Sequence, residues 1–232
     1  MLELILVLIG GRIGSMSYNI LNEDVYSFVE GIDFILSKYK YYDKDTLRDT
    51  SSSLPYSIQL IENSIGNLID FNSFLQIVIF DVLIGNSDRH HSNWGLRYII
   101  KDSKLYVSIS PLYDNGSSLC AYEDTNNIKL FKKDKMKFEA LINTKSKSSI
   151  GWEKQRPIRH FELLSLIKQN YYEATLPYIK SIKNNITFEN IDIILNEFDN
   201  TIINNDMKEL LKMYILERRD RILEIYNLKD EV

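Results

Sequence analysis

The sequence predicts an α+β protein that is mostly helical and carries one small β-hairpin beside a polar loop. Apolar residues recur at helical spacing over most of the chain, whereas residues 95–110 read as two β-rich runs. The 232 residues are 44% hydrophobic and 12% aromatic, which is enough for one packed core. We therefore expect a single domain over residues 1–232.

The N-terminus, MLELILVLIGG, has an apolar run from Leu2 to Ile9 that is too short to cross a bilayer. Glu3 stands where a signal peptide carries positive charge. The run therefore predicts a buried strand. The following GGRIGS (10–15) predicts a plain turn, because it lacks the lysine of a Walker loop and the spacing of a dinucleotide fingerprint. Since no other long apolar run follows, we expect a soluble cytoplasmic protein.

Three helices are predicted before the polar loop. The first spans Glu23 to Tyr42, and the second begins near Pro55, after the turn-forming DTSSSLPYS (49–57). The third begins near Asp70 and ends at Gly85. Its apolar stripe is broad enough for a deeply buried helix and consists of Phe71, Phe74, Leu75, Val78, Ile79, Val82 and Leu83.

Beyond the polar loop the pattern changes to strands. GLRYII (95–100) and LYVSIS (105–110) predict a hairpin joined by KDSK (101–104). The chain is expected to be helical again from Asp134, and two amphipathic helices are predicted between Thr187 and Leu228.

A segment rich in serine and lysine, NTKSKSSIGWEKQRP (143–157), interrupts this helical region. It contains Ser146, Ser148 and Ser149, which are possible phosphorylation sites. A flexible basic surface loop is the interpretation that we favour.

The polar loop NSDRHHSN (86–93) is the candidate functional site. Asp88 and Asn93 lie on it, and the antiparallel hairpin is expected to return Asp114 to the same place. Each of these residues alone is also compatible with a cap or a turn. Together, two carboxylates and an amide form the all-oxygen set that Mg²⁺ prefers. A carboxylate beside such a metal can orient a hydroxyl for attack on phosphorus, so the loop predicts phosphoryl transfer.

A zinc site formed by histidine and cysteine side chains is a weaker hypothesis. His90 and His91 are sequence neighbours that usually point apart, and only His160 and Cys120 remain to complete a zinc site. We expect His90 to brace the loop and His91 to face solvent. The single cysteine excludes an internal disulfide. The net charge of −4 gives no indication of nucleic-acid binding.

The segments DVLIGNSDRHHSNWGL (81–96) and ISPLYDNGSSL (109–119) resemble the catalytic core of HipA-like serine/threonine kinases. The shared pattern is a Gly-Asn-x-Asp-Arg-His-x-x-Asn loop, a hairpin and a Pro-x-Tyr-Asp segment. The resemblance covers most of the chain from about residue 65 onward. It implies a protein-kinase-like C-terminal lobe that uses ATP with Mg²⁺ or Mn²⁺.

The resemblance also implies roles for individual residues. Asp88 matches the catalytic base, and Asn93 and Asp114 match the metal ligands. Arg89 and His90 match residues that brace the loop around them. It does not identify the residues that bind the nucleotide.

The resemblance is incomplete upstream of the first helix. A complete kinase has a glycine-rich loop and a strand lysine held by a helix glutamate. Here the first lysine is Lys38, within a helical pattern, and the strand Leu2 to Ile9 is expected near the lobe boundary. We therefore expect the nucleotide-clamping lobe to be missing, or supplied by another polypeptide, and the isolated chain to transfer phosphate slowly.

The resemblance implies a protein substrate and an antitoxin as partners, as in the toxin pairs of this family. We expect the chain to bind neither nucleic acid nor a membrane. A phosphoinositide-type lipid kinase is one alternative, because that group shares the Asp-Arg-His-x-x-Asn loop. The chain has no basic amphipathic segment for anionic membranes, which counts against it. A non-catalytic remnant used as a binding module is the other alternative.

Overall fold

The computed structural model describes residues 4–9, 12–17 and 26–229. Its helical elements are α1 (Gly31–Lys38), α2 (Ile58–Ile65), α3 (Asn72–Ile84), α4 (Thr125–Lys133), α5 (Lys135–Glu139), the π-helical turn η1 (Ala140–Thr144), α6 (His160–Asn185), α7 (Phe188–Asn196) and α8 (Asn205–Ile225). Its strands are β1 (Leu4–Ile9), β2 (Arg12–Ser17), β3 (Ser27–Glu30), β4 (Tyr42–Asp43), β5 (Arg48–Asp49), β6 (Gly95–Lys101), β7 (Lys104–Ile109), β8 (Lys147–Ser148) and β9 (Ile158–Arg159).

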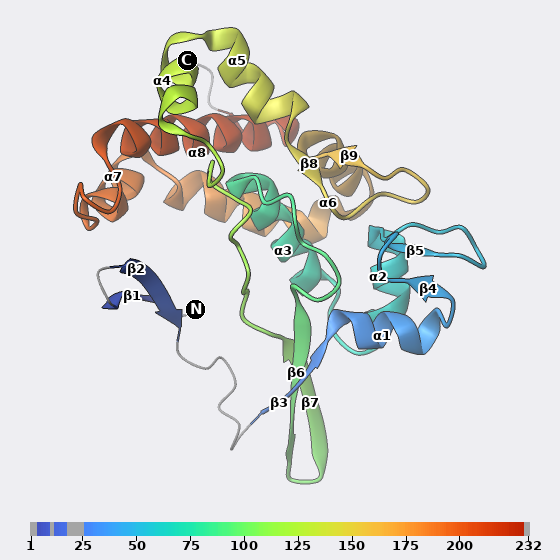
Figure 1. The fold of residues 1–232 in the computed structure, drawn as a ribbon. Coiled ribbons are helices and arrows are strands. Elements are labelled where there is room, and N and C mark those ends of the chain that lie inside the picture. The colour runs from blue at the N-terminus through green and yellow to red at the C-terminus, as the bar shows by residue number, and fades with distance from the viewer. Residues whose placement is uncertain (1–3, 10–11, 18–25, 230–232) are drawn as a thin grey trace.

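Helix α3 lies at the centre of the helical body, as Figure 1 shows, and packs against both α6 and α8. Its first turns join a core cluster with α1, α2 and Trp94, through Phe74 and Val78. Its last turns join a second cluster with α4, α6 and α8, through Val82 and Leu83. These two clusters bury most of the helix, while Gln76 and Phe80 remain exposed. The predicted buried helix is confirmed, and it ends as expected at Gly85, which has a left-handed φ of 70°.

The predicted hairpin is also present. Strands β6 and β7 pair antiparallel from Leu96↔Ile109 to Lys101↔Lys104, so the turn consists of Asp102 and Ser103. Both turn residues have positive φ, which a two-residue hairpin turn requires. The hairpin projects from the helical body (Figure 1), and its base lies beside the first turns of α3, where Trp94 packs against Phe74.

The predicted helix from Glu23 to Tyr42 is wrong at both ends, since α1 stops at Lys38 and Tyr42 belongs to β4. Ser27–Glu30 is instead strand β3, which pairs with β6 from Ser27↔Tyr98 to Glu30↔Gly95. Helix α1 begins only at Gly31, whose backbone N–H continues the pairing to Trp94 O at 2.9 Å. The free edge of the hairpin offers backbone partners, and this tertiary contact overrides the helical spacing of the side chains. Val25, which is part of the expected stripe, lies outside the described residues.

Two further elements differ from expectation. Helix α4 begins at Thr125, nine residues before the predicted start at Asp134, because Asp124 caps it by accepting a bond from the Asn127 backbone. Residues 12–15 belong to β2 rather than to a turn, and only residues 10 and 11 join it to β1. Those two residues lie outside the described part, as do residues 2 and 3 of the predicted first strand. No helix among the described residues is long and apolar enough to cross a membrane.

Candidate active site

The polar loop starts where α3 ends. The left-handed turn at Gly85 points the chain away from the helix axis, and Asn86 closes the turn with a backbone bond to Asp81 O at 2.9 Å. Asn86 is buried, and its side chain donates to Asp81 Oδ1 at 3.0 Å. The next residues, Ser87 and Asp88, are exposed. The loop therefore presents Asp88 to solvent from a buried and hydrogen-bonded base.

Asn93 is fastened to the backbone of Asp88. Its side-chain Nδ2 donates to Asp88 O at 2.7 Å, and its backbone N–H donates to His90 O at 3.0 Å. Among the described residues, no donor contacts its Oδ1. The amide nitrogen of this buried side chain thus holds the loop closed, while its oxygen stays available as a ligand atom.

Arg89 connects the loop to the rest of the site. It is almost fully buried (1% exposed) and forms an ion pair with Asp81 at 2.9 Å. Its Nη1 donates both to Asn93 O and to Tyr113 O, each at 2.7 Å. Its Nη2 also donates to Asn115 Oδ1 at 2.5 Å. All five N–H groups of a guanidinium lie in one plane, so a single side chain can fix several segments together.

Asp114 lies between the two residues that Arg89 holds. Tyr113 and Asn115 flank it, and it is exposed with a left-handed φ of 52°. Burial raises the pKa of Tyr113 to about 12, so its hydroxyl stays protonated and donates to Ser92 O at 2.9 Å. Two independent contacts therefore join the segment of Asp114 to the loop of Asp88 and Asn93. The structure brings the three predicted site residues into one region.

The two adjacent histidines differ in their surroundings. His90 is partly exposed, and its Nδ1 accepts from the Ser92 backbone N–H at 3.2 Å, within the loop. His91 is buried, and the expectation that it faces solvent is wrong. Its ring meets Tyr42 and Tyr56 edge-on, and its Nδ1 lies 3.3 Å from the Tyr42 hydroxyl. Burial, followed by the charge of His90, lowers the pKa of His91 to about 4. His91 therefore anchors the loop in the core as a neutral ring.

The donor set suits a hard cation better than zinc. In the described part of the chain, no three side chains of the His, Cys, Asp or Glu type meet in a group that holds a metal ion. Asn93 Oδ1 and the exposed carboxylate of Asp114 are both hard oxygen ligands. Mg²⁺ and Mn²⁺ are commonly bound by one or two such ligands together with water and phosphate oxygens. These residues therefore fit a metal that arrives with a phosphate-bearing ligand.

Comparison with known proteins decides the family. The family model of the HipA-like C-terminal domain matches residues 27–175, which include the whole loop, the hairpin and Asp114. The chain belongs to the HipA-like C-terminal domain family. The resemblance that the loop motif indicated is therefore confirmed, and so is the mostly helical α+β fold class.

Two matches describe relatives of this HipA-like chain. Serine/threonine-protein kinase CtkA of Helicobacter pylori (strain J99 / ATCC 700824) is 26% identical over 207 residues, which are 83% of this chain. The matched region spans 61% of the length of that relative. The crystal structure of a Helicobacter pylori proinflammatory kinase CtkA shares the fold, with a TM-score of 0.79 at 19% identity. That match covers 97% of this chain and 78% of the other.

Two residues that contact the HipA-like loop were not predicted from the sequence. The Nε2 of His160 lies 2.9 Å from Asn86 O, and the hydroxyl of Ser149 donates to Ser87 O at 2.6 Å. The side chain of Asn93 donates to the next carbonyl, Asp88 O. The carbonyls of three consecutive residues, 86 to 88, are therefore each hydrogen-bonded to a different side chain. Both unpredicted residues are distant in sequence, and no local pattern distinguishes them.

The serine- and lysine-rich segment is packed against the site, contrary to the flexible surface loop that was expected. Ser146 is buried, and its hydroxyl lies 2.6 Å from His160 Nδ1 and accepts from Arg218 Nη1 at 2.7 Å. Burial, followed by the charge of Arg218, lowers the pKa of His160 to about 3, so its ring is neutral. Since Asn86 O only accepts, the His160 proton sits on Nε2 and Nδ1 accepts from Ser146. A chain of hydrogen bonds thus runs from α8 to the loop.

Proposed function

We propose that this chain is the catalytic region of a protein kinase that transfers the γ-phosphate of Mg-ATP or Mn-ATP to serine or threonine hydroxyls. The observation that carries the proposal is the contact of Arg89 with both Asn93 O and Tyr113 O. This contact joins the segments that carry Asn93 and Asp114, the two proposed oxygen ligands, next to the exposed Asp88. The relative from Helicobacter pylori is named a serine/threonine-protein kinase, which supports the same reaction.

Asp88 is the residue that we assign as the base. It is exposed on a loop whose carbonyls are held on both sides, so its backbone is fixed while its carboxylate remains open to an acceptor. It orients the acceptor hydroxyl and takes its proton as the oxygen attacks phosphorus and ADP leaves. Most of the rate enhancement in such a reaction comes from positioning and charge neutralisation, which a rigid loop provides.

Asn93 and Asp114 are the residues that we assign to the metal. A bound Mg²⁺ or Mn²⁺ would neutralise charge on the phosphate oxygens. Asn93 offers Oδ1 because its Nδ2 is committed to Asp88 O. Asp114 offers a carboxylate from a segment that Arg89 and Ser92 hold in place. Asn93 and Asp114 thus present ligand atoms from two segments that need to move little when a metal binds.

The partners are proposed from the family alone. They are a protein substrate and an antitoxin. Co-purification of the chain from its native cells, followed by mass spectrometry, would identify such proteins.

Phosphoryl transfer from γ-labelled ATP to a generic acceptor such as casein tests the proposal. The chain should be assayed with Mg²⁺ and with Mn²⁺, alone and with the N-terminal lobe of a related kinase added. We expect label in protein that Asp88→Asn removes, whereas Asp45→Asn, a change of another exposed aspartate, leaves it unchanged. If neither condition gives transfer above background, the proposal fails and a non-catalytic binding module is the better account.

A further inference from the structure

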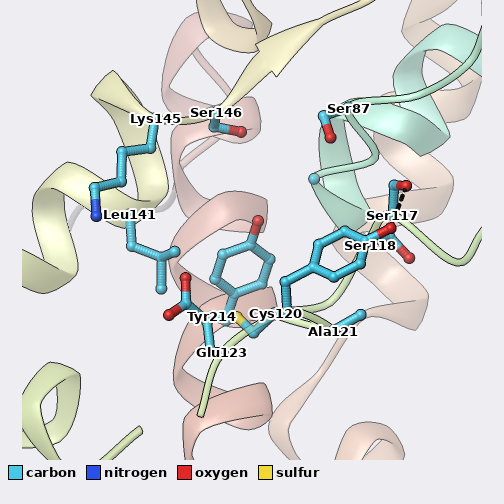
Figure 2. A pocket seen from close by; sticks show the side chains of 12 residues that line it. Ser87, Ser117, Ser118, Cys120, Ala121, Glu123, Leu141, Lys145, Ser146 and Tyr214 are labelled. Atoms are coloured by element: carbon cyan, nitrogen blue, oxygen red, sulfur yellow. Dashed lines mark hydrogen bonds between the residues drawn. The ribbon is translucent and has the colours of Figure 1, made fainter. Parts of the chain in front are cut away.

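A small pocket opens beside the proposed base. Its volume is about 170 Å³, and Figure 2 shows it between the loop residue Ser87, the segment of Ser117 and Glu123, and Tyr214 of α8. Ser87, which lines the pocket, is the immediate sequence neighbour of Asp88, so the Cα atoms of the two residues lie about 3.8 Å apart. The Ser117–Glu123 segment follows Asp114 in the chain. The pocket is therefore bounded by both segments of the proposed active site.

The size of the pocket indicates what kind of group it holds. Sites for nucleotides and drug-sized ligands measure about 300–1,000 Å³, whereas this pocket of about 170 Å³ suits a single amino-acid side chain. An extended peptide advances about 3.3 Å per residue. A peptide whose acceptor hydroxyl reaches Asp88 would therefore place a residue about one to three positions away at the pocket.

The lining of the pocket combines apolar side chains, the hydroxyls of four serines (Ser87, Ser117, Ser118 and Ser146) and one carboxylate. Leu141 and the ring of Tyr214 supply apolar surface, and Glu123 supplies a carboxylate. Burial first, and then the charge of Glu123, raise the pKa of the pocket residue Cys120 to about 12. The charge of Arg218 acts on this thiol in the opposite direction.

The one lysine that lines the pocket does not cancel this charge. Lys145 and Glu123 both lie in the part of the chain that the structure describes, and no ion pair with an N···O distance of 4.0 Å or less joins them. In Figure 2 the ammonium of Lys145 points outward, away from Tyr214. The carboxylate of Glu123 is therefore left to pair with an incoming group, and lysine or arginine fits best. The apolar stem of such a side chain would lie along Leu141 and Tyr214 while its charge meets Glu123.

We propose that this pocket binds a basic side chain next to the acceptor serine or threonine of the substrate, and that Glu123 selects it. The inference rests on the proposed kinase function, because it assumes a peptide whose hydroxyl reaches Asp88. It names the substrate class: protein segments in which lysine or arginine lies about one to three residues from the acceptor.

The test uses the full chain and fluorescent peptides that contain one serine in an alanine–glycine background. In each peptide one lysine occupies one of the three positions on either side of the serine, and a matched peptide has glutamine there. Fluorescence anisotropy reports affinity without requiring catalysis. We expect one lysine peptide to bind about three- to fivefold more tightly than its glutamine match, the range of a partly exposed ion pair. Glu123→Gln should remove that preference, and Glu123→Lys should make a glutamate peptide the better ligand.

Two further variants separate the pocket from general effects. Glu173→Gln changes an exposed carboxylate of α6 outside the pocket and should leave the lysine preference intact. Ala121→Phe fills the pocket from an exposed lining position and should weaken binding of the preferred peptide without lowering the melting temperature. A lysine preference that survives Glu123→Gln, or no preference in any register, overturns the inference. Preference in a chain that transfers no phosphate, either alone or with the added N-terminal lobe, would instead refute the kinase function and leave the pocket assignment standing.

Discussion

Arg89 and Asp81 form a bidentate ion pair in the core. Arg89 Nε donates to Asp81 Oδ2 and Nη2 donates to Oδ1, both at 2.9 Å. Their exposed fractions are 1% and 3%. Burial raises the pKa of Asp81, while the bonds from Arg89 and Asn86 act in the opposite direction. The pair joins the last turns of α3 to the polar loop, and the remaining donors of Arg89 reach Asn93, Tyr113 and Asn115. One buried guanidinium thus supports both the fold and the site.

Replacing Arg89 with methionine should lower the free energy of unfolding by about 3–5 kcal/mol, because Asp81 would remain buried without its partner. Urea denaturation of the variant and of the unaltered chain measures this difference. Binding of Mn²⁺ with ATP should be lost as well, since the bonds that fix Asn93 O and Tyr113 O to one side chain would be gone and the bond from Tyr113 to Ser92 O would be left to join the two segments.

The double change Asp81→Leu with Arg89→Met separates the two roles. A buried ion pair replaced by apolar residues often costs little, so most of the stability should return. Metal-dependent nucleotide binding should stay lost. Recovery of that binding in the double variant would show that the contacts of Arg89 with Asn93 and Tyr113 do not position the ligands.

The stability of the protein should fall as the pH is lowered from 6.5 toward 4. The pKa of His91 is about 4 in the folded chain and 6.5 when unperturbed, so between these values the unfolded chain binds a proton that the folded chain does not. The stability that neutral His91 contributes is therefore fully present above pH 6.5 and is lost on acidification. His160, with a pKa of about 3, acts in the same direction.

His91→Phe tests this assignment, because it keeps the ring contacts with Tyr42 and Tyr56 but cannot titrate. Urea unfolding at pH 7.5 and at pH 5 gives the loss of stability on acidification for each protein. The loss should be smaller in the variant. Equal losses would mean that another group causes the acid sensitivity.

Gly85→Ala should destabilise the chain by about 1–3 kcal/mol. The residue has a φ of 70°, and an added Cβ would lie 1.9 Å from the Tyr214 hydroxyl oxygen. Tyr214→Phe removes that oxygen, so the alanine should cost less in this background. A double-mutant cycle measured by thermal unfolding gives the coupling. Strictly additive effects would argue that backbone strain alone makes glycine necessary.

Ser149→Ala should slow phosphate transfer by about three- to tenfold, because the Ser87 carbonyl next to Asp88 loses its hydrogen bond. Ser149 is only partly buried, so the melting temperature should change little. The effect should appear in kcat rather than in the KM for ATP. Ser64→Ala is a matched control, since its hydroxyl bonds Leu60 O within α2, far from the loop in sequence. A slowed Ser64→Ala variant would remove the case for a specific role of Ser149.

Local patterns were sufficient for the elements that depend on local chemistry. The apolar stripe and Gly85 correctly predict α3 and its end, and the two β-rich runs predict the hairpin. Asp88, Asn93 and Asp114 follow from their spacing, because an antiparallel hairpin returns the chain to its start. The contacts of Arg89 show that the three residues share one region.

The missed features all depend on contacts between residues that are far apart in sequence. Strand β3 has helical side-chain spacing, and its partner β6 lies more than 60 residues downstream. His91 is buried by Tyr42, 49 residues upstream. His160 contacts Asn86 across 74 residues, and Ser149 contacts Ser87 across 62. Nothing in the neighbouring sequence distinguishes such residues from an exposed histidine or a flexible serine loop.

The most direct test of the proposed site is calorimetric titration of Mn²⁺ with ATP into the unaltered chain and into Asp114→Asn. The substitution keeps the shape of the side chain but removes the charge of a proposed ligand. Asp102→Asn, at the exposed tip of the hairpin, is the matched control. The account predicts metal-dependent binding that Asp114→Asn weakens by about tenfold or more, as loss of a ligating charge should, and that Asp102→Asn leaves unchanged. An affinity in Asp114→Asn equal to that of the unaltered chain would contradict the assignment of this site.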